Sequence, residues 1–361
     1  MDRHLATGRH AFRGLFPNLD ASPSPPLHGA APEDLLAWAR RHRVAGLLQA
    51  GLPDAGAEIR ALAFGQAQHV ARATLEAERL FARLSPGVPS LALVKGPALA
   101  AQAWPQPGLR SFDDLDFICA RDGYPELVAG LRELGYAPAE ADSRRMEPLW
   151  HFGWGVAFRG PNGFMVEANH RFFPPHYPWP RGLDAGRVDG FAPLELDGGA
   201  VRAPTPALHL LLCCAHAVWH GWARLAWIVD IAGLLARHPG IRLQAEALAA
   251  DGAFARRTLA AGCGLAEAIF GPSLAGDLPP APEKEIAEAR ALLEGTAPGP
   301  DGRALRRFHE RFMAPREIRA YRLRRIFIPG DGDFRWLALP GSLRGLYWLL
   351  RPARGLGAGK R

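Results

Sequence analysis

The stretch RSFDDLDFICA, residues 110–120, places three aspartates within four positions and then continues into an apolar run. Successive side chains of a strand point to opposite faces. Asp114 and Asp116 are therefore expected to share one face, with Leu115 and Phe117 directed into the core behind them. Carboxylates this close repel each other unless a cation lies between them. The stretch therefore predicts a strand that carries an acidic site.

Divalent metal chemistry fits such a face. Hard oxygen ligands suit Mg²⁺ or Mn²⁺, and phosphoryl or nucleotidyl transfer uses two metals about 3.5–4 Å apart. A two-metal site usually has a third carboxylate, and the stretch FMVEANHRF, residues 164–172, offers Glu167. If this strand neighbours the first, Glu167 completes a triad, either as a base for an incoming hydroxyl or as a metal bridge.

The aspartates also have an interpretation as a surface turn, in which Asp113 and Asp114 cap a loop and Asp116 pairs with an arginine such as Arg110. Lys95 presents a similar choice. The basic residues are overwhelmingly arginine, yet this lysine stands inside an apolar segment. It fits a phosphate contact, and it also fits a side chain that snorkels from the edge of a sheet. The residues alone leave both choices open.

Composition excludes several classes of protein. The 361 residues are enough for two or three compact units. The sequence contains no run of about 20 uncharged apolar residues, so it predicts no transmembrane helix. The first residues, MDRHLATGRHAFRGLF, lack the apolar core of a secretory signal, so a cytoplasmic location is expected. The four cysteines lack metal-ligand spacing and are expected to be free thiols, most of them in the core.

The net charge of +7 is unevenly distributed. Residues 303–361 contain 15 Lys and Arg against 4 Asp and Glu. Such a segment suits contact with phosphate, nucleic acid or an anionic membrane surface. It equally suits a solvated helix face in an arginine-rich protein.

Apolar periodicity predicts a chain that is helical, then mixed, then helical. Residues 1–31 are expected to form an irregular arm, and 173–182 a proline-dense loop. Helices are expected over 32–52, 56–84, 97–104, 124–136 and most of the chain after Pro206. Strands are expected over 91–96, 114–120, 150–160 and 164–172, the last two joined by a Pro-Asn-Gly hairpin turn.

The stretch CCAHAVWHGWARLAWIVDI, residues 213–231, carries His216 and His220 one helical turn apart, followed by Arg224 and Asp230. The spacing fits a zinc site, although the glutamate of a metalloprotease motif is absent. It also fits buried polar residues that bond to one another, for example His216 or Arg224 with Asp230. A third interpretation has the helix facing a metal site. The surrounding tryptophans suit core packing or stacking on a nucleobase.

Several motifs occur in an order that resembles the uncharacterised nucleotidyltransferase family. They are LVKGPALAAQAW (93–104), PGLRSFDDLDF (107–117), LRELGY (131–136) and the histidine-bearing block PTPALHLLLCCAHAVWHGWARLAWIVDIAGLL (204–235). The resemblance covers about residues 88 to 240. It implies an α+β fold with a polymerase-β-like nucleotidyltransferase core and a short mixed sheet. N-terminal and C-terminal helical regions flank this core. The implied divisions are an N-terminal arm with helices (1–84), the core (85–203) and a helical domain with a basic tail (204–361).

The resemblance also implies site residues. Asp114 and Asp116 match the metal-binding pair, Glu167 matches the third acid, and Gly96 matches the glycine that lets the chain approach nucleotide phosphates. Two Mg²⁺, or Mn²⁺, and an NTP, with ATP expected, are the implied cofactor and substrate.

This sequence departs from the wider superfamily at the first strand. It has Lys95-Gly96-Pro97 where Gly-Ser or Gly-Gly is usual, so Lys95 or Arg110 is expected to replace the serine that touches a phosphate. In the strand expected at 164–172, Glu167 stands one residue further from His170 than the acid does in the family pattern. His216, His220 and Arg224 are expected to meet phosphate or acceptor.

Three functions follow as hypotheses. The first is an enzyme that moves an NMP group from an NTP to a hydroxyl or phosphate of an unknown small molecule, sugar, peptide or protein. The family resemblance implies that the gene belongs to a biosynthetic cluster. The second is an inactive nucleotide-binding or scaffold protein. The third is RNA binding through the basic C-terminal segment, which also suits peripheral contact with a membrane surface or a partner.

Overall fold

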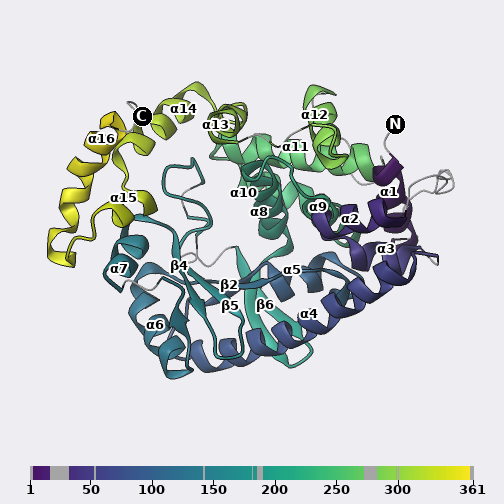
Figure 1. The fold of residues 1–361 in the computed structure, drawn as a ribbon, viewed down its shortest axis with the longest axis horizontal. Coiled ribbons are helices and arrows are strands. Elements are labelled where there is room, and N and C mark those ends of the chain that lie inside the picture. The colour runs from purple at the N-terminus through teal and green to yellow at the C-terminus, as the bar shows by residue number, and fades with distance from the viewer. Residues whose placement is uncertain are drawn as a thin grey trace. The chain divides into compact units, whose positions relative to one another are not determined.

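The computed structural model divides into two compact units, each assembled from segments that are distant in the sequence. The first unit comprises residues 1–76, 95–112 and 204–312, and the second comprises 77–94, 113–203 and 313–361. Figure 1 labels many of the elements of both units. Within these limits the structure describes residues 3–16, 32–52, 54–140, 143–180, 182–184, 190–271, 283–297, 299 and 301–357.

The first unit is helical, and α8 (Pro206–Trp219) lies at its centre. It packs against α9 (Leu225–Arg237), α10 (Ile241–Leu248) and α11 (Ala253–Phe270). Nearly all of α8 is buried, as expected for a helix that is apolar on every side. The unit also contains α1 (Arg3–Leu15), α2 (Pro32–His42), α3 (Ala45–Gly51), the first part of α4 (Ala57–Leu84), α5 (Gly96–Ala103), α12 (Glu283–Leu293) and α13 (Gly302–Glu310).

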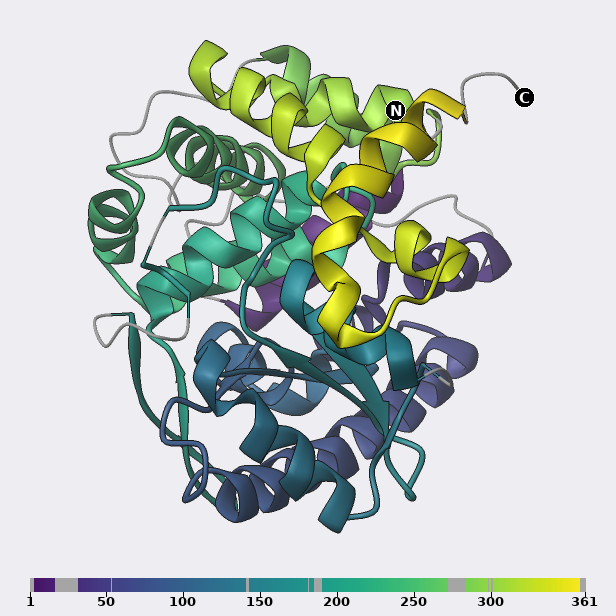
Figure 2. The ribbon, with the colours of Figure 1, turned by 90° about the vertical axis from the view of Figure 1, so that its left-hand side faces the viewer.

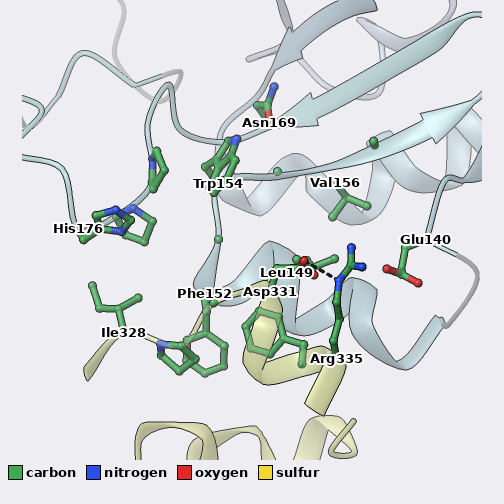
Figure 3. Close-up of a pocket in the computed structure, with 18 of the residues that line it drawn as sticks. Glu140, Leu149, Phe152, Trp154, Val156, Asn169, His176, Ile328, Asp331 and Arg335 are labelled. Carbon is green, nitrogen blue, oxygen red and sulfur yellow. Dashed lines mark hydrogen bonds and ion pairs between the residues drawn. The ribbon is translucent and has the colours of Figure 1, made fainter. Parts of the chain in front are cut away.

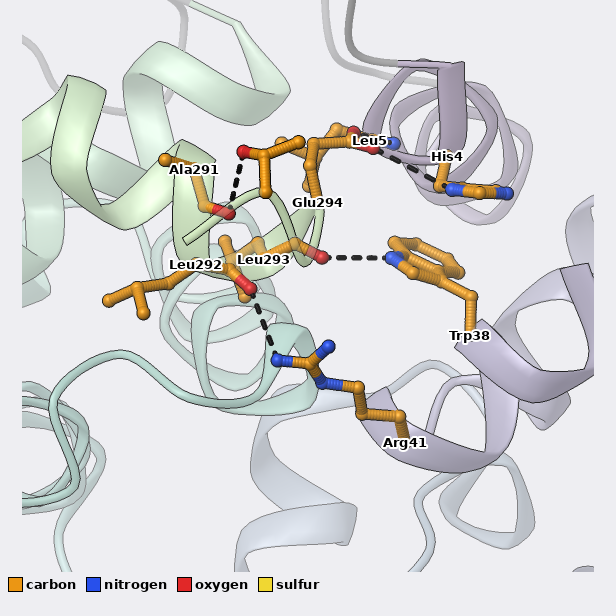
Figure 4. Close-up of polar contacts among 9 residues, drawn as sticks. His4, Leu5, Trp38, Arg41, Ala291, Leu292, Leu293 and Glu294 are labelled. Atoms are coloured by element: carbon orange, nitrogen blue, oxygen red, sulfur yellow. Dashed lines mark hydrogen bonds and ion pairs between the residues drawn. The ribbon is translucent and has the colours of Figure 1, made fainter. Parts of the chain in front are cut away.

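The carboxyl end of α12 is held by side chains and backbone from α1 and α2 (Figure 4). Trp38 Nε1 donates to the Leu293 carbonyl at 3.0 Å, and Arg41 Nη2 donates to the Leu292 carbonyl at 3.4 Å. The Leu5 amide donates to Glu294 at 2.7 Å. The last carbonyls of a helix lack partners within the helix, so these contacts tie the N-terminal helices to α12.

The second unit is built on a five-stranded mixed sheet with the order β1-β2-β5-β4-β3. Only the β2–β5 pair is parallel, and the other pairs are antiparallel. The strands are β1 (Ala92–Val94), β2 (Asp114–Ile118), β3 (Ala137–Pro138), β4 (Gly155–Arg159) and β5 (Met165–Asn169). The predicted strands at 91–96, 114–120 and 164–172 and the hairpin between β4 and β5 are thus confirmed.

Helices and a small second sheet complete this unit. The helices are the end of α4, α6 (Tyr124–Glu133), α7 (Ser143–Phe152), α14 (Pro315–Phe327), α15 (Asp331–Trp336) and α16 (Tyr347–Gly357), and the second sheet pairs β6 (Phe191–Leu196) with β7 (Gly199–Pro204). Figure 2 shows α15 and α16 in yellow, and α15 packs against α7. Phe152, Phe334 and Tyr347 form the apolar cluster that joins them.

Several of the C-terminal arginines are engaged within this unit. Asp333 is 1% exposed and lies 3.3 Å from Arg351 Nη1 and 2.5 Å from Arg354 Nε. Arg335 Nε lies 2.7 Å from Asp331, and Arg344 pairs with Glu147. The basic segment therefore takes part in ion pairs within its own unit, of which those at Asp333 involve a buried carboxylate and those of Arg335 and Arg344 lie at the surface.

Three predictions about the elements need correction, and one element was missed. Residues 3–15 form α1 rather than an irregular arm, while 17–31 lie outside the described residues. The helix expected over 32–52 is interrupted at Arg43, whose φ of 56° is not helical. Residues 150–152 end α7 instead of starting a strand, because Phe152 packs on the C-terminal aromatic cluster. The β6–β7 hairpin was not anticipated.

The cysteine prediction is confirmed, since all four are free and buried. Within the described part of the chain, no helix is long and apolar enough to cross a membrane. The helix α4 contributes residues to both units. The expected division into 1–84, 85–203 and 204–361 stays a prediction.

Candidate active site

The acidic stretch at residues 110–120 contains β2 of the second unit. Leu115 and Phe117 are fully buried on one face of the sheet, which leaves Asp114 and Asp116 on the other. Alternation of acidic and apolar residues therefore produces the expected arrangement. Asp116 is buried at 9% exposure, and Asp114 is half-buried.

Glu167 lies on the strand next to the two aspartates. β2 and β5 are parallel neighbours, and their register pairs Asp116 with Glu167 and Asp114 with Met165. Adjacent strands lie about 4.8 Å apart, and paired residues point to the same face. The fold thus gathers three carboxylates on one face of two neighbouring strands, from segments about 50 residues apart in the sequence.

The side chains in this grouping are not arranged as a finished metal centre. Among the described residues, no group of three or more His, Cys, Asp or Glu side chains has an arrangement that could hold a metal ion. The case for a metal site at Asp114, Asp116 and Glu167 therefore rests on the strand register and on the chemistry of the donor set.

The Lys95-Gly96 turn belongs to the first unit and has unusual backbone angles. Lys95 has φ 54° and ψ −143°, and Gly96 has φ 43°. A non-glycine residue in this region carries a conformational cost of order 1–3 kcal/mol, and such residues cluster at functional sites. The turn leads directly into α5, with Pro97 in its first turn, so the amide groups at the start of this helix follow the strained residue.

A buried histidine holds this turn in place. The Lys95 amide donates to His209 Nε2 at 3.2 Å, and His209 Nδ1 lies 2.6 Å from Gln102 Oε1. Because Nε2 accepts, Nδ1 carries the proton and donates to Gln102. Burial lowers the pKa of His209 to about 3, with further lowering by the charges of Arg110 and Lys95, so the neutral tautomer persists. Gln102 in turn donates to the Pro204 carbonyl at 2.9 Å.

Arg110 binds a carboxylate that was not anticipated as its partner. Its Nε donates to Asp230 Oδ1 at 2.8 Å and its Nη2 donates to Asp230 Oδ2 at 3.0 Å. Trp104 Nε1 donates to the same carboxylate at 2.8 Å. The sequence suggests His216 or Arg224 as partners of Asp230, and Asp116 or a phosphate as partners of Arg110. In the structure the bidentate fork of Arg110 satisfies the carboxylate of Asp230, which is 2% exposed.

The remaining predicted nucleotide-binding residues form a second group in the first unit. His216 and His220 lie with their ring centroids 4.5 Å apart, and Trp227 packs against both rings. The guanidinium of Arg224 lies 5.5 Å from the centre of the Trp227 ring. Burial, reinforced by the charge of Lys95, lowers the pKa of half-buried His216 well below its ordinary value. Burial also lowers the pKa of His220, to about 4. The group therefore offers two neutral imidazoles beside the Arg224 cation.

Sequence reasoning missed His209 and Gln102. A histidine inside the otherwise apolar run LHLLL was the available signal, because a polar side chain at such a position must find a buried partner. The partner is the amide of the strained residue Lys95, which is more than 100 residues away in the sequence. The local sequence pattern around His209 does not predict this partner.

Comparison with known proteins adds one result to this geometry. A family described as an uncharacterised nucleotidyltransferase matches residues 28–271, which is most of the chain and includes β2, β5, α5 and α8. A search of the curated proteins found no match. Because the family match spans most of the chain, the chain belongs to the uncharacterised nucleotidyltransferase family.

Proposed function

We propose that this protein moves an NMP group from an NTP, with ATP as the expected donor, to a hydroxyl or phosphate of an acceptor. The catalytic part would be a polymerase-β-like core in the second unit, with Asp114, Asp116 and Glu167 as its acids. The observation that carries the proposal is the parallel register of β2 and β5, which brings Glu167 beside Asp116. A surface turn would not need a third acid on the neighbouring strand.

The donor set fits a hard divalent cation. All three residues offer carboxylate oxygens, the ligands that Mg²⁺ and Mn²⁺ prefer. Metal bound there would neutralise charge on the triphosphate and on the departing pyrophosphate. Asp114 and Asp116 would bind the cation, and their mutual repulsion would be relieved by it.

Glu167 would hold the acceptor oxygen and receive its proton when the acceptor is a hydroxyl. In the transfer, the acceptor oxygen forms a bond to the α-phosphorus of the NTP. The bond from that phosphorus to the bridging β-oxygen breaks, and pyrophosphate leaves with the bonding electrons.

Several residues of the first unit stay candidates for nucleotide binding on the basis of their own chemistry. Lys95 and Gly96 stand at the strained turn before α5, where amide groups and a cation suit an anionic phosphate. His216, His220 and Arg224 supply neutral donors and a cation. The fork of Arg110 is engaged by Asp230, so its proposed part is to anchor the segment that leads into β2.

Calorimetric titration with ATP, in the presence and absence of Mg²⁺ or Mn²⁺, tests this proposal. We expect metal-dependent binding by the wild type and its loss in the Asp114→Asn/Asp116→Asn variant. Asp197→Asn is the matched control, since Asp197 is an exposed residue in the turn between β6 and β7 of the same unit. Radiolabelled ATP and cell extract would then reveal transfer to an acceptor.

Three outcomes would contradict the proposal in different ways. ATP binding that ignores both the metal and the double variant would indicate a nucleotide-binding protein without this site. A lack of binding to any NTP would leave a scaffold. RNA binding that falls steeply with salt, together with no NTP binding, would favour the basic C-terminal segment as the functional part.

A further inference from the structure

The second unit contains a cavity of about 480 Å³ beside the sheet face that carries Glu167 (Figure 3). Its floor is formed by β4 and β5, including Glu167 and Asn169, and the end of α7 adds Phe152. Its opposite wall is formed by residues 328–335, which include Phe334 and Arg335. This wall lies outside the part of the chain that matches the family.

Two small residues on β4 lie opposite Glu167 and Asn169. Ala157 is the register partner of Glu167, and Gly155 is the register partner of Asn169. A β-carbon on Gly155 would lie 1.9 Å from the Asn169 side-chain oxygen. The strand can therefore lie against Asn169 only without a side chain at this position. A larger residue at 157 would fill the space directly beside Glu167.

The lining combines apolar side chains with polar and charged groups, namely Glu140, Glu167, Asn169, His176, Arg325, Asp331, Arg335 and Arg351. Phe152, Ile328 and Phe334 form an apolar wall, and Trp154 presents a large ring that is 37% exposed. In Figure 3, Arg335 extends from α15 toward the sheet, between Asp331 and Glu140. Apolar walls with a few convergent polar groups are typical of small-molecule sites, which usually span about 300–1,000 Å³.

We propose that this cavity is the acceptor site, and that the acceptor is a small hydroxyl-bearing molecule with an aromatic or aliphatic body. The body would contact Trp154 and the apolar wall, and the hydroxyl would lie at the Glu167 end beside Asn169. The proposal rests on the proposed function for the reaction at Glu167. A polymer or a folded protein does not match a cavity of this size.

Saturation-transfer NMR with 2-naphthol as the probe tests the site, with myo-inositol as a polyol of similar hydroxyl chemistry and no apolar body. We expect the full-length protein to bind 2-naphthol and not myo-inositol. Trp154→Ala should weaken binding about tenfold through the loss of ring contact. Trp336→Ala is the matched control, because Trp336 is another exposed tryptophan of the same unit that does not line the cavity.

Ala157→Leu is a second variant, and it should abolish 2-naphthol binding by filling the cavity. Binding that is equal in the wild type and in Trp154→Ala and Ala157→Leu would overturn the proposal, as would a preference for myo-inositol. Neither ATP nor metal is present in this assay. A failure here with normal metal-dependent ATP binding would refute only the acceptor site, whereas a failure of ATP binding alone would refute the proposed nucleotide chemistry.

Discussion

Removal of the Asp230 carboxylate should be one of the most destabilising single changes in the first unit. Asp230 is 2% exposed and accepts three hydrogen bonds, two from the Arg110 guanidinium and one from the Trp104 indole. Asp230→Ala would leave the buried cation of Arg110 without its carboxylate. Breaking a buried ion pair from one side typically costs about 3–5 kcal/mol, and total stabilities are about 5–15 kcal/mol.

The reverse deletion and the double replacement make this prediction specific. Arg110→Met should cost a similar amount, because the carboxylate of Asp230 then stays buried. Arg110→Met/Asp230→Leu should be far less destabilising than the sum of the single changes, since replacement of a whole buried pair by apolar residues is often neutral. The coupling between the two sites is therefore expected to be at least about 2 kcal/mol.

Urea unfolding followed by tryptophan fluorescence measures all four proteins. Single variants that lose less than about 1 kcal/mol, or a double variant that loses the sum of the two, would refute the reasoning. Calorimetry with ATP and Mg²⁺ on the double variant also separates two roles of Arg110. If the double variant still binds ATP, Arg110 acts as a structural anchor. If the double variant is folded but does not bind ATP, the result would support the hypothesis that Arg110 contacts a phosphate.

Two further predictions concern the stability of the same unit. His209 and His42 are both 0% exposed, and burial lowers their pKa values to about 3 and about 4. The unfolded chain therefore takes up protons first as the pH falls below about 6.5, so stability should decrease toward pH 4 by up to about 1.4 kcal/mol per pH unit for each histidine. Urea unfolding between pH 7.5 and 4.5 measures this slope, which His209→Gln should reduce, and an unchanged slope would contradict the assignment. A β-carbon on Gly51 would lie 2.1 Å from the Ala11 carbonyl oxygen, so Gly51→Ala should cost at least about 1–3 kcal/mol by overpacking. Gly65→Ala, at an open position in α4, should instead stabilise by about 0.5–1 kcal/mol, and thermal unfolding distinguishes the two results.

Local patterns anticipated much of the second unit. The alternation in DLDFI predicted β2 and the face on which Asp114 and Asp116 lie, because side-chain direction in a strand follows sequence position. The Pro-Asn-Gly turn predicted the β4–β5 hairpin, because few residues adopt that turn without strain. The same reasoning was wrong at residues 150–152, where the pattern WHFGWG suits a strand but packing against Phe334 ends a helix.

The sequence alone therefore determined the acidic strand, the strand that carries Glu167, and the membership of a nucleotidyltransferase family. The two strands depend on residues close together in the chain, where spacing translates directly into direction and chemistry. The parallel pairing of these strands came from the fold. Only the tertiary structure decided which partner Arg110 takes, why a histidine stands in α8, and that residues 328–335 wall a cavity beside Glu167. A buried polar group bonds to whatever packing brings within about 3 Å, and that neighbour comes from a segment more than 100 residues away in each of these cases.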